Sequence, residues 1–178
     1  MLRARLRPAL VVLTCVSAAA LIATAYARFC PYSLSWNLTA SIPKGLYWSK
    51  AYAGAPLQRG DIVCFLYREP HWAIGRNYFP TGFRLCKPVA GVSGDVVTKH
   101  EGTVQVHAKG VTQIAVPVAS QDMKGRALST DALVEGVVPA GELVLLAPRY
   151  PNSYDSRYVG LVSTSELTHQ VWPLWVKD

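Results

Sequence analysis

The chain has 178 residues, of which 51% are hydrophobic and 16% are charged, and its formal net charge is +7. This composition excludes a disordered chain, and the length suits one globular domain with an appended segment. Three of the positive charges, Arg3, Arg5 and Arg7, lie together at the start of the chain, and the other basic residues are scattered, so nucleic-acid binding is not expected.

The first predicted element is a transmembrane helix over residues 9–27. This segment contains no charged residue, no Gly and no Pro, and about twenty such residues span the hydrocarbon core of a bilayer. A cleaved signal peptide is the alternative, because the segment ends in small residues. The preceding arginines make residues 1–8 a cytoplasmic basic tail, and residues 28–178 are then the periplasmic domain of a single-pass protein in a bacterial inner membrane.

Six short segments after this helix predict β-strands, because they are rich in β-branched residues and are bounded by Gly, Pro or Asp. They are residues 60–67, 83–92, 94–100, 103–108, 112–119 and 141–148. Their even spacing predicts a mostly β domain built as a barrel. Glu101-Gly102 predicts a hairpin turn, and residues 163–172 predict the one helical turn of the domain.

The four cysteines and four histidines do not form a metal-binding pattern. No CxxC pair and no His/Cys cluster occurs in the sequence, so neither a zinc site nor any other cofactor is predicted. Cys15 lies in the predicted membrane span, whereas Cys30, Cys64 and Cys86 follow it and would meet an oxidising compartment.

Two residues could form a catalytic pair. Ser41 lies in the stretch NLTASIPKGLYW, a loop rich in turn-forming residues, and Lys87 lies in the apolar stretch RLCKPVAGV. Burial disfavours the charged form of a lysine and lowers its pKa, so a buried Lys87 could act as the general base for a serine hydroxyl. Each residue alone also fits a structural role, and a Ser-His-Asp triad is a further alternative.

A third polar stretch, NSYDSRYVG, covers residues 152–160. Here Asp155 could cap the backbone of a turn and pair with Arg157, with Ser153 close by. This structural reading and a catalytic one are compatible.

Taken in order, these stretches resemble the successive motifs of the type I signal peptidase superfamily. The matching positions are Ser-x-Pro at 41–43, Gly-Asp-x-Val at 60–63, Lys87 followed by Val-x-Gly-x-x-Gly-Asp at 89–95, and Ser-x-Asp-Ser-Arg-Tyr-x-Gly at 153–160. Within this superfamily, the stretches SIPKGLYW, PAGELVLL and VWPLWV are most similar to the TraF-type maturation peptidases of plasmid conjugation systems.

The resemblance implies a signal-peptidase-like β-barrel catalytic domain in which Ser41 is the nucleophile and Lys87 the base. It also implies that the Thr39 hydroxyl and the backbone N–H of Ser41 form the oxyanion hole. Pro88 stands where the superfamily usually has an arginine. Because proline lacks an N–H donor, Lys87 is predicted to lie at a sheet edge or a bulge.

Five further residues receive expected roles from the resemblance. Ser153 would bond to the lysine and orient it. Asp155 is predicted as a catalytic residue beside Ser41 and Lys87, and it would form an ion pair with the supporting residue Arg157. Cys64 and Cys86 would be neighbours on antiparallel strands, which fits either a disulfide or two buried free thiols.

The implied substrate is a propilin. The acyl-enzyme would be resolved by the pilin's own N-terminal amine, which would make the pilin circular. The expected partners are the inner membrane and other conjugative transfer (type IV secretion) proteins, with no nucleic acid. Two alternatives stay open, namely an ordinary signal peptidase that releases secreted proteins and a non-catalytic anchored scaffold of a conjugation channel.

Overall fold

The computed structural model describes residues 2–177. Met1, the first residue of the predicted basic tail, and Asp178, the last residue of the predicted periplasmic domain, lie outside this range. The chain divides into two compact units, Met1–Ser33 and Leu34–Asp178.

The first unit consists mainly of helix α1, Leu2–Phe29. The predicted transmembrane segment, residues 9–27, lies within α1 and stays a prediction. Within residues 2–177, no helix combines the length and the apolar character that a membrane crossing requires.

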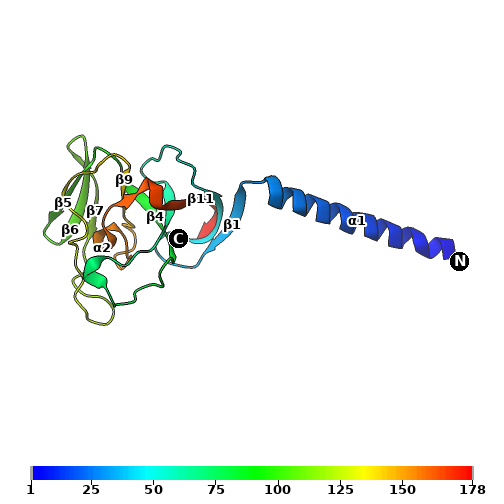
Figure 1. Cartoon of the computed structure of the whole chain (residues 1–178), viewed down its shortest axis with the longest axis horizontal. Coiled ribbons are helices and arrows are strands. Elements are labelled where there is room, and N and C mark those ends of the chain that lie inside the picture. The colour runs from blue at the N-terminus through cyan, green and yellow to red at the C-terminus, as the bar shows by residue number, and fades with distance from the viewer. Residues whose placement is uncertain (1, 178) are drawn as a thin grey trace. The chain divides into compact units, whose positions relative to one another are not determined.

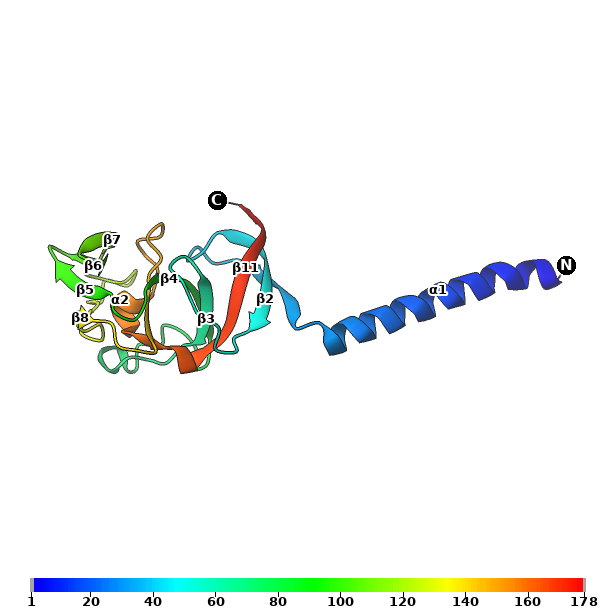
Figure 2. The ribbon, with the colours of Figure 1, turned by 90° about the horizontal axis from the view of Figure 1, so that it is seen from above.

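A seven-stranded sheet with the strand order β1-β2-β11-β3-β4-β9-β10 lies in the second unit, except for the first two residues of β1. Figure 1 labels β1, β4, β9 and β11 of this sheet. Its strands are β1 (Tyr32–Asn37), β2 (Lys44–Ala51), β3 (Ile62–Leu66), β4 (Arg84–Gly91), β9 (Glu142–Leu145), β10 (Val162–Ser163) and β11 (Leu167–Lys177). Strand β11 pairs antiparallel with both β2 and β3, and Figure 2 shows it running between them. The sheet is therefore held together by the most C-terminal of its strands.

A four-stranded sheet with the order β7-β6-β5-β8 completes the strand structure. Its strands are β5 (Val96–His100), β6 (Thr103–Ala108), β7 (Val111–Pro117) and β8 (Gly136–Val137). Three short helical segments lie between strands: η1 (His71–Ala73), α2 (Ser156–Val159) and η2 (Thr164–Glu166). The mostly β prediction is confirmed. The predicted barrel is not confirmed, because in the described part of the chain the larger sheet ends at β1 on one side and at β10 on the other.

All six predicted strand segments coincide with a strand of the structure to within a few residues, namely β3, β4, β5, β6, β7 and β9. The predicted hairpin is also confirmed, since His100 pairs with Thr103 across a two-residue turn. Glu101 and Gly102 in this turn have φ angles of 45° and 70°. Positive φ at both positions is typical of the turn that matches the twist of a β-hairpin.

The predicted helical turn over residues 163–172 is wrong in most of its length. Only Thr164–Glu166 forms a short helix, and from Leu167 onward the chain is strand β11. The reason is tertiary, because β11 exchanges ladder hydrogen bonds with a strand on each side and these outweigh a weak local helix preference. Strands β1 and β2 were likewise not predicted.

A small apolar cluster packs beneath the loop that carries Ser41. It consists of Ile42, Tyr47, Cys64 and Val171, each no more than 4% exposed. The Tyr47 hydroxyl donates a hydrogen bond of 2.6 Å to the Pro43 carbonyl. These contacts tie the end of the loop to the sheet below it.

Gly45 allows strand β2 to approach β11 closely at the end of the same loop. A Cβ atom at this position would lie 2.2 Å from the Trp175 carbonyl oxygen, and the φ angle of Gly45 is +144°. Both the space and the backbone conformation therefore require glycine here. The turn around Ser41 is thus shaped by packing between strands as well as by its own sequence.

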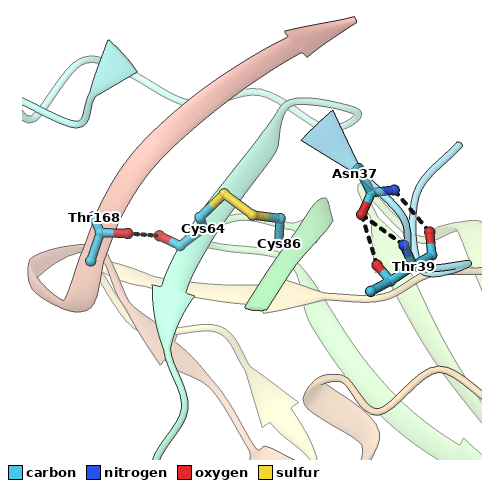
Figure 3. The surroundings of a disulfide bond; sticks show 5 residues. All are labelled: Asn37, Thr39, Cys64, Cys86 and Thr168. Carbon is cyan, nitrogen blue, oxygen red and sulfur yellow. Dashed lines mark hydrogen bonds between the residues drawn. A yellow bond between two sulfur atoms is a disulfide. The ribbon is translucent and has the colours of Figure 1, made fainter. Parts of the chain in front are cut away.

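A disulfide joins Cys64 on β3 to Cys86 on β4. The two residues are direct antiparallel partners with a Cα–Cα distance of 4.0 Å, and Figure 3 shows the bridge between the two strands. The Thr168 hydroxyl donates a hydrogen bond of 3.1 Å to the Cys64 carbonyl. The bridge thus crosslinks two strands of the larger sheet at the residue that precedes Lys87.

We expect thiol labelling of the unreduced, denatured full chain to modify Cys15 and Cys30 and to leave Cys64 and Cys86 unmodified, because only the first two are free thiols. Mass spectrometry of labelled peptides before and after reduction measures this. A Cys64→Ala/Cys86→Ala double variant is the control, since reduction should add no label to it. Label on Cys86 before reduction would show that the bridge does not form.

Candidate active site

The Ser41 loop connects β1 to β2 and is organised by Asn37, the last residue of β1. The Asn37 amide nitrogen donates hydrogen bonds to the carbonyl oxygens of Thr39, Ile42 and Pro43 at 2.8, 3.0 and 3.1 Å. One side chain therefore fixes the backbone on both sides of Ser41. The sequence analysis did not single out Asn37, although an Asn directly before a turn-rich stretch is a known signal for side-chain capping of a turn.

Thr39 is bound to the other end of the same amide. Its backbone N–H and its hydroxyl donate to the Asn37 side-chain oxygen at 3.2 and 2.8 Å, as Figure 3 shows. Thr39 is exposed, whereas Ser41 is half-buried. The threonine hydroxyl is thus held in a defined place two residues before the serine.

Lys87 lies on β4 opposite Val63 and is only 2% exposed. Its ammonium nitrogen, Nζ, donates a hydrogen bond to the Ser41 hydroxyl oxygen, Oγ. Burial lowers the pKa of Lys87 to about 8, the negative charge of Asp155 acts to raise this pKa, and the positive charge of Arg157 acts to lower it. A sizeable fraction of Lys87 is therefore neutral at mildly alkaline pH.

The backbone around Lys87 contains the irregularity that Pro88 predicts. Strand β4 lies inside the sheet between β3 and β9, so the edge alternative is wrong. The register between β4 and β9 shifts between Val89 and Gly91, directly after Pro88. The missing proline N–H thus lies next to a register shift, whereas Lys87 itself keeps a regular pairing with Val63.

Ser153 lies close to Ser41 but bonds differently from the expectation. Its hydroxyl donates to Ser41 Oγ at 3.4 Å, whereas the resemblance predicts a bond to Lys87. The Ser153 backbone is fixed by its own N–H, which donates to Tyr150 O at 2.8 Å, and by its carbonyl, which accepts from Arg157 at 2.8 Å. This fixed backbone directs the hydroxyl toward the serine that Lys87 also contacts.

Asp155 and Arg157 form a fully buried ion pair. Two guanidinium nitrogens of Arg157 donate to the two carboxylate oxygens at 2.8 and 3.0 Å, and the Ala147 N–H also donates to Asp155 at 3.1 Å. Arg157 further donates to the Pro151 carbonyl at 2.9 Å. The pair therefore anchors the segment that carries Ser153, and its two charges largely offset one another near Lys87.

Ser41 lines two cavities. The lysine-side cavity has a volume of about 430 Å³ and is also lined by Thr39, Lys87 and Ser153. The proline-side cavity has a volume of about 560 Å³. It is named for the prolines in its wall, Pro43, Pro88 and Pro148. The serine thus has open space on two sides.

The sequence matches the profile of the family described as signal peptidase, peptidase S26, over residues 5–175. It is 32% identical over 153 residues to the conjugal transfer protein TraF of Agrobacterium fabrum (strain C58 / ATCC 33970), covering 80% of this chain and 82% of that protein. It is 27% identical over 149 residues to the plasmid transfer protein TraF of Escherichia coli, covering 78% and 80%. A crystal structure of a signal peptidase I from Enterococcus faecalis V583 aligns with a TM-score of 0.36 and 21% identity, over 64% of this chain and 94% of that one.

We expect Lys87→Met to raise the free energy of unfolding at pH 7 by about 1 to 3 kcal/mol, because it removes an amine whose charge is disfavoured in the fold. The pKa of Lys87 falls from 10.5 to about 8 on folding. The wild-type penalty is therefore fully present below about pH 8 and is lost as the pH rises toward 10.5. Urea unfolding of the full chain at several pH values measures this.

The matched control is Lys124→Met, which changes an exposed lysine. It should leave the unfolding free energy within about 0.5 kcal/mol of wild type. Equal stability of Lys87→Met and wild type at pH 7 would show that the fold does not disfavour the charged lysine.

Proposed function

Because the chain belongs to the signal peptidase family, peptidase S26, we propose that Ser41 and Lys87 form its catalytic pair and that it processes a propilin in a conjugative plasmid transfer system. The observation that carries this proposal is the hydrogen bond from the buried Lys87 amine to the Ser41 hydroxyl. The conjugation context is supported by the two relatives named as transfer proteins, which match about four fifths of the chain.

In the first step, neutral Lys87 accepts the proton of the Ser41 hydroxyl as Oγ attacks the carbonyl carbon of the substrate. The pKa of about 8 for Lys87 makes the neutral form accessible near physiological pH. The carbonyl oxygen becomes an oxyanion, to which the Ser41 N–H would donate together with the Thr39 hydroxyl, whose one proton would turn from the Asn37 side-chain oxygen to the oxyanion. Collapse of this intermediate expels the amine of the leaving peptide, which takes its proton from Lys87, and leaves an acyl-enzyme on Ser41.

The supporting residues act on the position and the pKa of the base. Ser153 donates to Ser41, so it helps to hold the nucleophile against Lys87. Asp155 pairs with Arg157, which limits the rise in the Lys87 pKa that the carboxylate would otherwise cause. In this proposal Asp155 is a positioning residue, because its hydrogen bonds go to Ala147 and Arg157.

In the second step, the N-terminal amine of the pilin would attack the acyl-enzyme and close a ring. Water as the acceptor would instead give a linear product, which is the outcome for an ordinary signal peptidase. The proposed site of action is the inner membrane, where the enzyme would work with other conjugative transfer proteins. This placement rests on the sequence pattern alone, namely the charge-free segment 9–27 and the arginines before it.

The test is mass spectrometry of the candidate pilin expressed together with the wild-type chain, with Ser41→Ala or with Lys87→Arg. We expect a trimmed pilin lighter by one water with wild type, and no processing with either variant. A guanidinium does not give up its proton, so Lys87→Arg should be as inactive as Ser41→Ala. The double variant should be no worse than either single one, because the two groups act as one unit.

Lys124→Arg, at an exposed position, is the matched control and should process the pilin normally. A trimmed product of full linear mass with wild type would support hydrolysis in place of cyclisation. Normal processing by Ser41→Ala or Lys87→Arg would reject the catalytic pair and favour the scaffold alternative.

Thr39→Val should slow processing by about 10²-fold, because it keeps the shape of the side chain but removes the oxyanion donor. Thr39→Ser restores the hydroxyl and should stay within about tenfold of wild type. Initial rates on a peptide substrate at saturating enzyme measure the difference. If valine and serine give the same rate, the oxyanion donor lies elsewhere.

A further inference from the structure

The proline-side cavity is the larger of the two cavities that Ser41 lines. No part of the substrate has so far been assigned to it. It reaches from the Ser41 loop to Gln113 on β7, in the smaller sheet. Its volume of about 560 Å³ lies in the range of small-molecule and peptide sites. A cavity of this size that opens onto a nucleophile is positioned to hold a reactant.

We infer that the proline-side cavity binds the acyl acceptor, the apolar N-terminal end of a peptide whose free amine resolves the acyl-enzyme on Ser41. This inference rests on the proposed function. By microscopic reversibility, the same cavity holds the peptide that leaves in the first step, since the departing amine and the attacking amine occupy the same place.

The backbone groups that line the two cavities indicate which part of the substrate each cavity binds. The lysine-side cavity is lined by Ser35, Trp36 and Asn37 of β1, and β1 is at the edge of the described sheet. An edge strand can pair with an extended peptide through backbone hydrogen bonds. This cavity therefore suits the acyl part of the substrate, which must be held in register with Ser41.

The proline-side cavity offers little backbone pairing. Three residues of its wall are prolines, which have no N–H to donate. The remaining wall is mainly aliphatic, with Ile42, Ile62 and Leu146 among its members. Such a wall recognises apolar side chains at a chain end and does not need a continuing strand, which fits an N-terminal segment.

The charges around this cavity favour an amine in its reactive, neutral form. None of its described lining residues is Asp or Glu, whereas Arg59 and Arg149 are both present. Arg59 is paired with Asp95, which does not line the cavity. An ammonium ion entering an apolar space beside guanidinium groups is disfavoured relative to the neutral amine, and only the neutral amine can attack an ester.

The acceptor step balances without an added reagent. The amine nitrogen attacks the carbonyl carbon of the Ser41 ester and transfers one proton to neutral Lys87. The C–N bond then forms fully as the bond from carbon to Ser41 Oγ breaks, and Lys87 returns the proton to Oγ. The products are an amide, a neutral serine and a neutral lysine.

Partitioning of the acyl-enzyme between an amine and water tests this inference. The full-length enzyme is given an activated ester of a propilin C-terminal peptide, so that the leaving group is constant. A dipeptide amide with N-terminal leucine is added as the acceptor, and the aminolysis and hydrolysis products are quantified. The variants are Gln113→Trp, which narrows the cavity from an exposed position, and Gln113→Glu, which adds a carboxylate of nearly the same shape.

We expect Gln113→Trp to lower the ratio of aminolysis to hydrolysis by about fivefold or more, because a narrower cavity excludes the acceptor peptide but not water. Gln113→Glu should lower the ratio at neutral pH and recover it at higher pH, because the carboxylate favours the protonated acceptor. Thr112→Trp, at the adjacent exposed residue that does not line the cavity, is the control and should leave the ratio unchanged.

An unchanged ratio in both Gln113 variants, with ester consumption intact, would overturn the acceptor site and leave the catalytic pair standing. A loss of ester consumption in Gln113→Trp is compatible with a leaving group held in the same cavity, and the ratio measured with Gln113→Glu then decides the inference. Failure of the wild-type chain to form an acyl-enzyme on Ser41 would overturn the proposed function and this inference together.

Discussion

The contact between a buried lysine amine and a serine hydroxyl sets the requirements for the rest of this structure. A charged lysine is costly to bury, and Lys87 is 2% exposed. The surrounding strands must therefore be stable enough to tolerate it. The buried Asp155–Arg157 pair, the disulfide next to Lys87 and the amide of Asn37 each fix one part of the backbone around it. These contacts fix the backbone of the site, and burial brings the pKa of Lys87 to about 8.

Much of this site was predictable because its chemistry depends on residue types in a fixed order. A lysine inside an apolar strand is unusual enough to be noticed, and Ser41 precedes it in a turn-rich loop. Local patterns also predicted six of the strands, namely β3, β4, β5, β6, β7 and β9, and the hairpin at Glu101-Gly102. These elements have strong short-range signals, since β-branched runs and positive-φ turn residues act within a few positions.

The unpredicted features depend on partners that are distant in the sequence. Strand β11 has a weak strand pattern and becomes a strand because β2 and β3 flank it. In β2, the buried positions include Ser49, which breaks the apolar alternation that identifies a half-buried strand. The hydroxyl of Ser153 reaches Ser41 across 112 positions of sequence. The proline-side cavity draws its wall from both sheets, so no local pattern could reveal it.

The position of β11 in the middle of the larger sheet has a consequence for biosynthesis. Residues 167–177 leave the ribosome after every other strand of that sheet, yet they separate β2 from β3. Until they emerge, the strand that follows the Ser41 loop lacks its neighbour, and Gly45 has no backbone to pack against. A nascent chain therefore carries Ser41 in a loop that lacks this support. The loop that carries Ser41 therefore gains the support of β11 only when translation has passed residue 177.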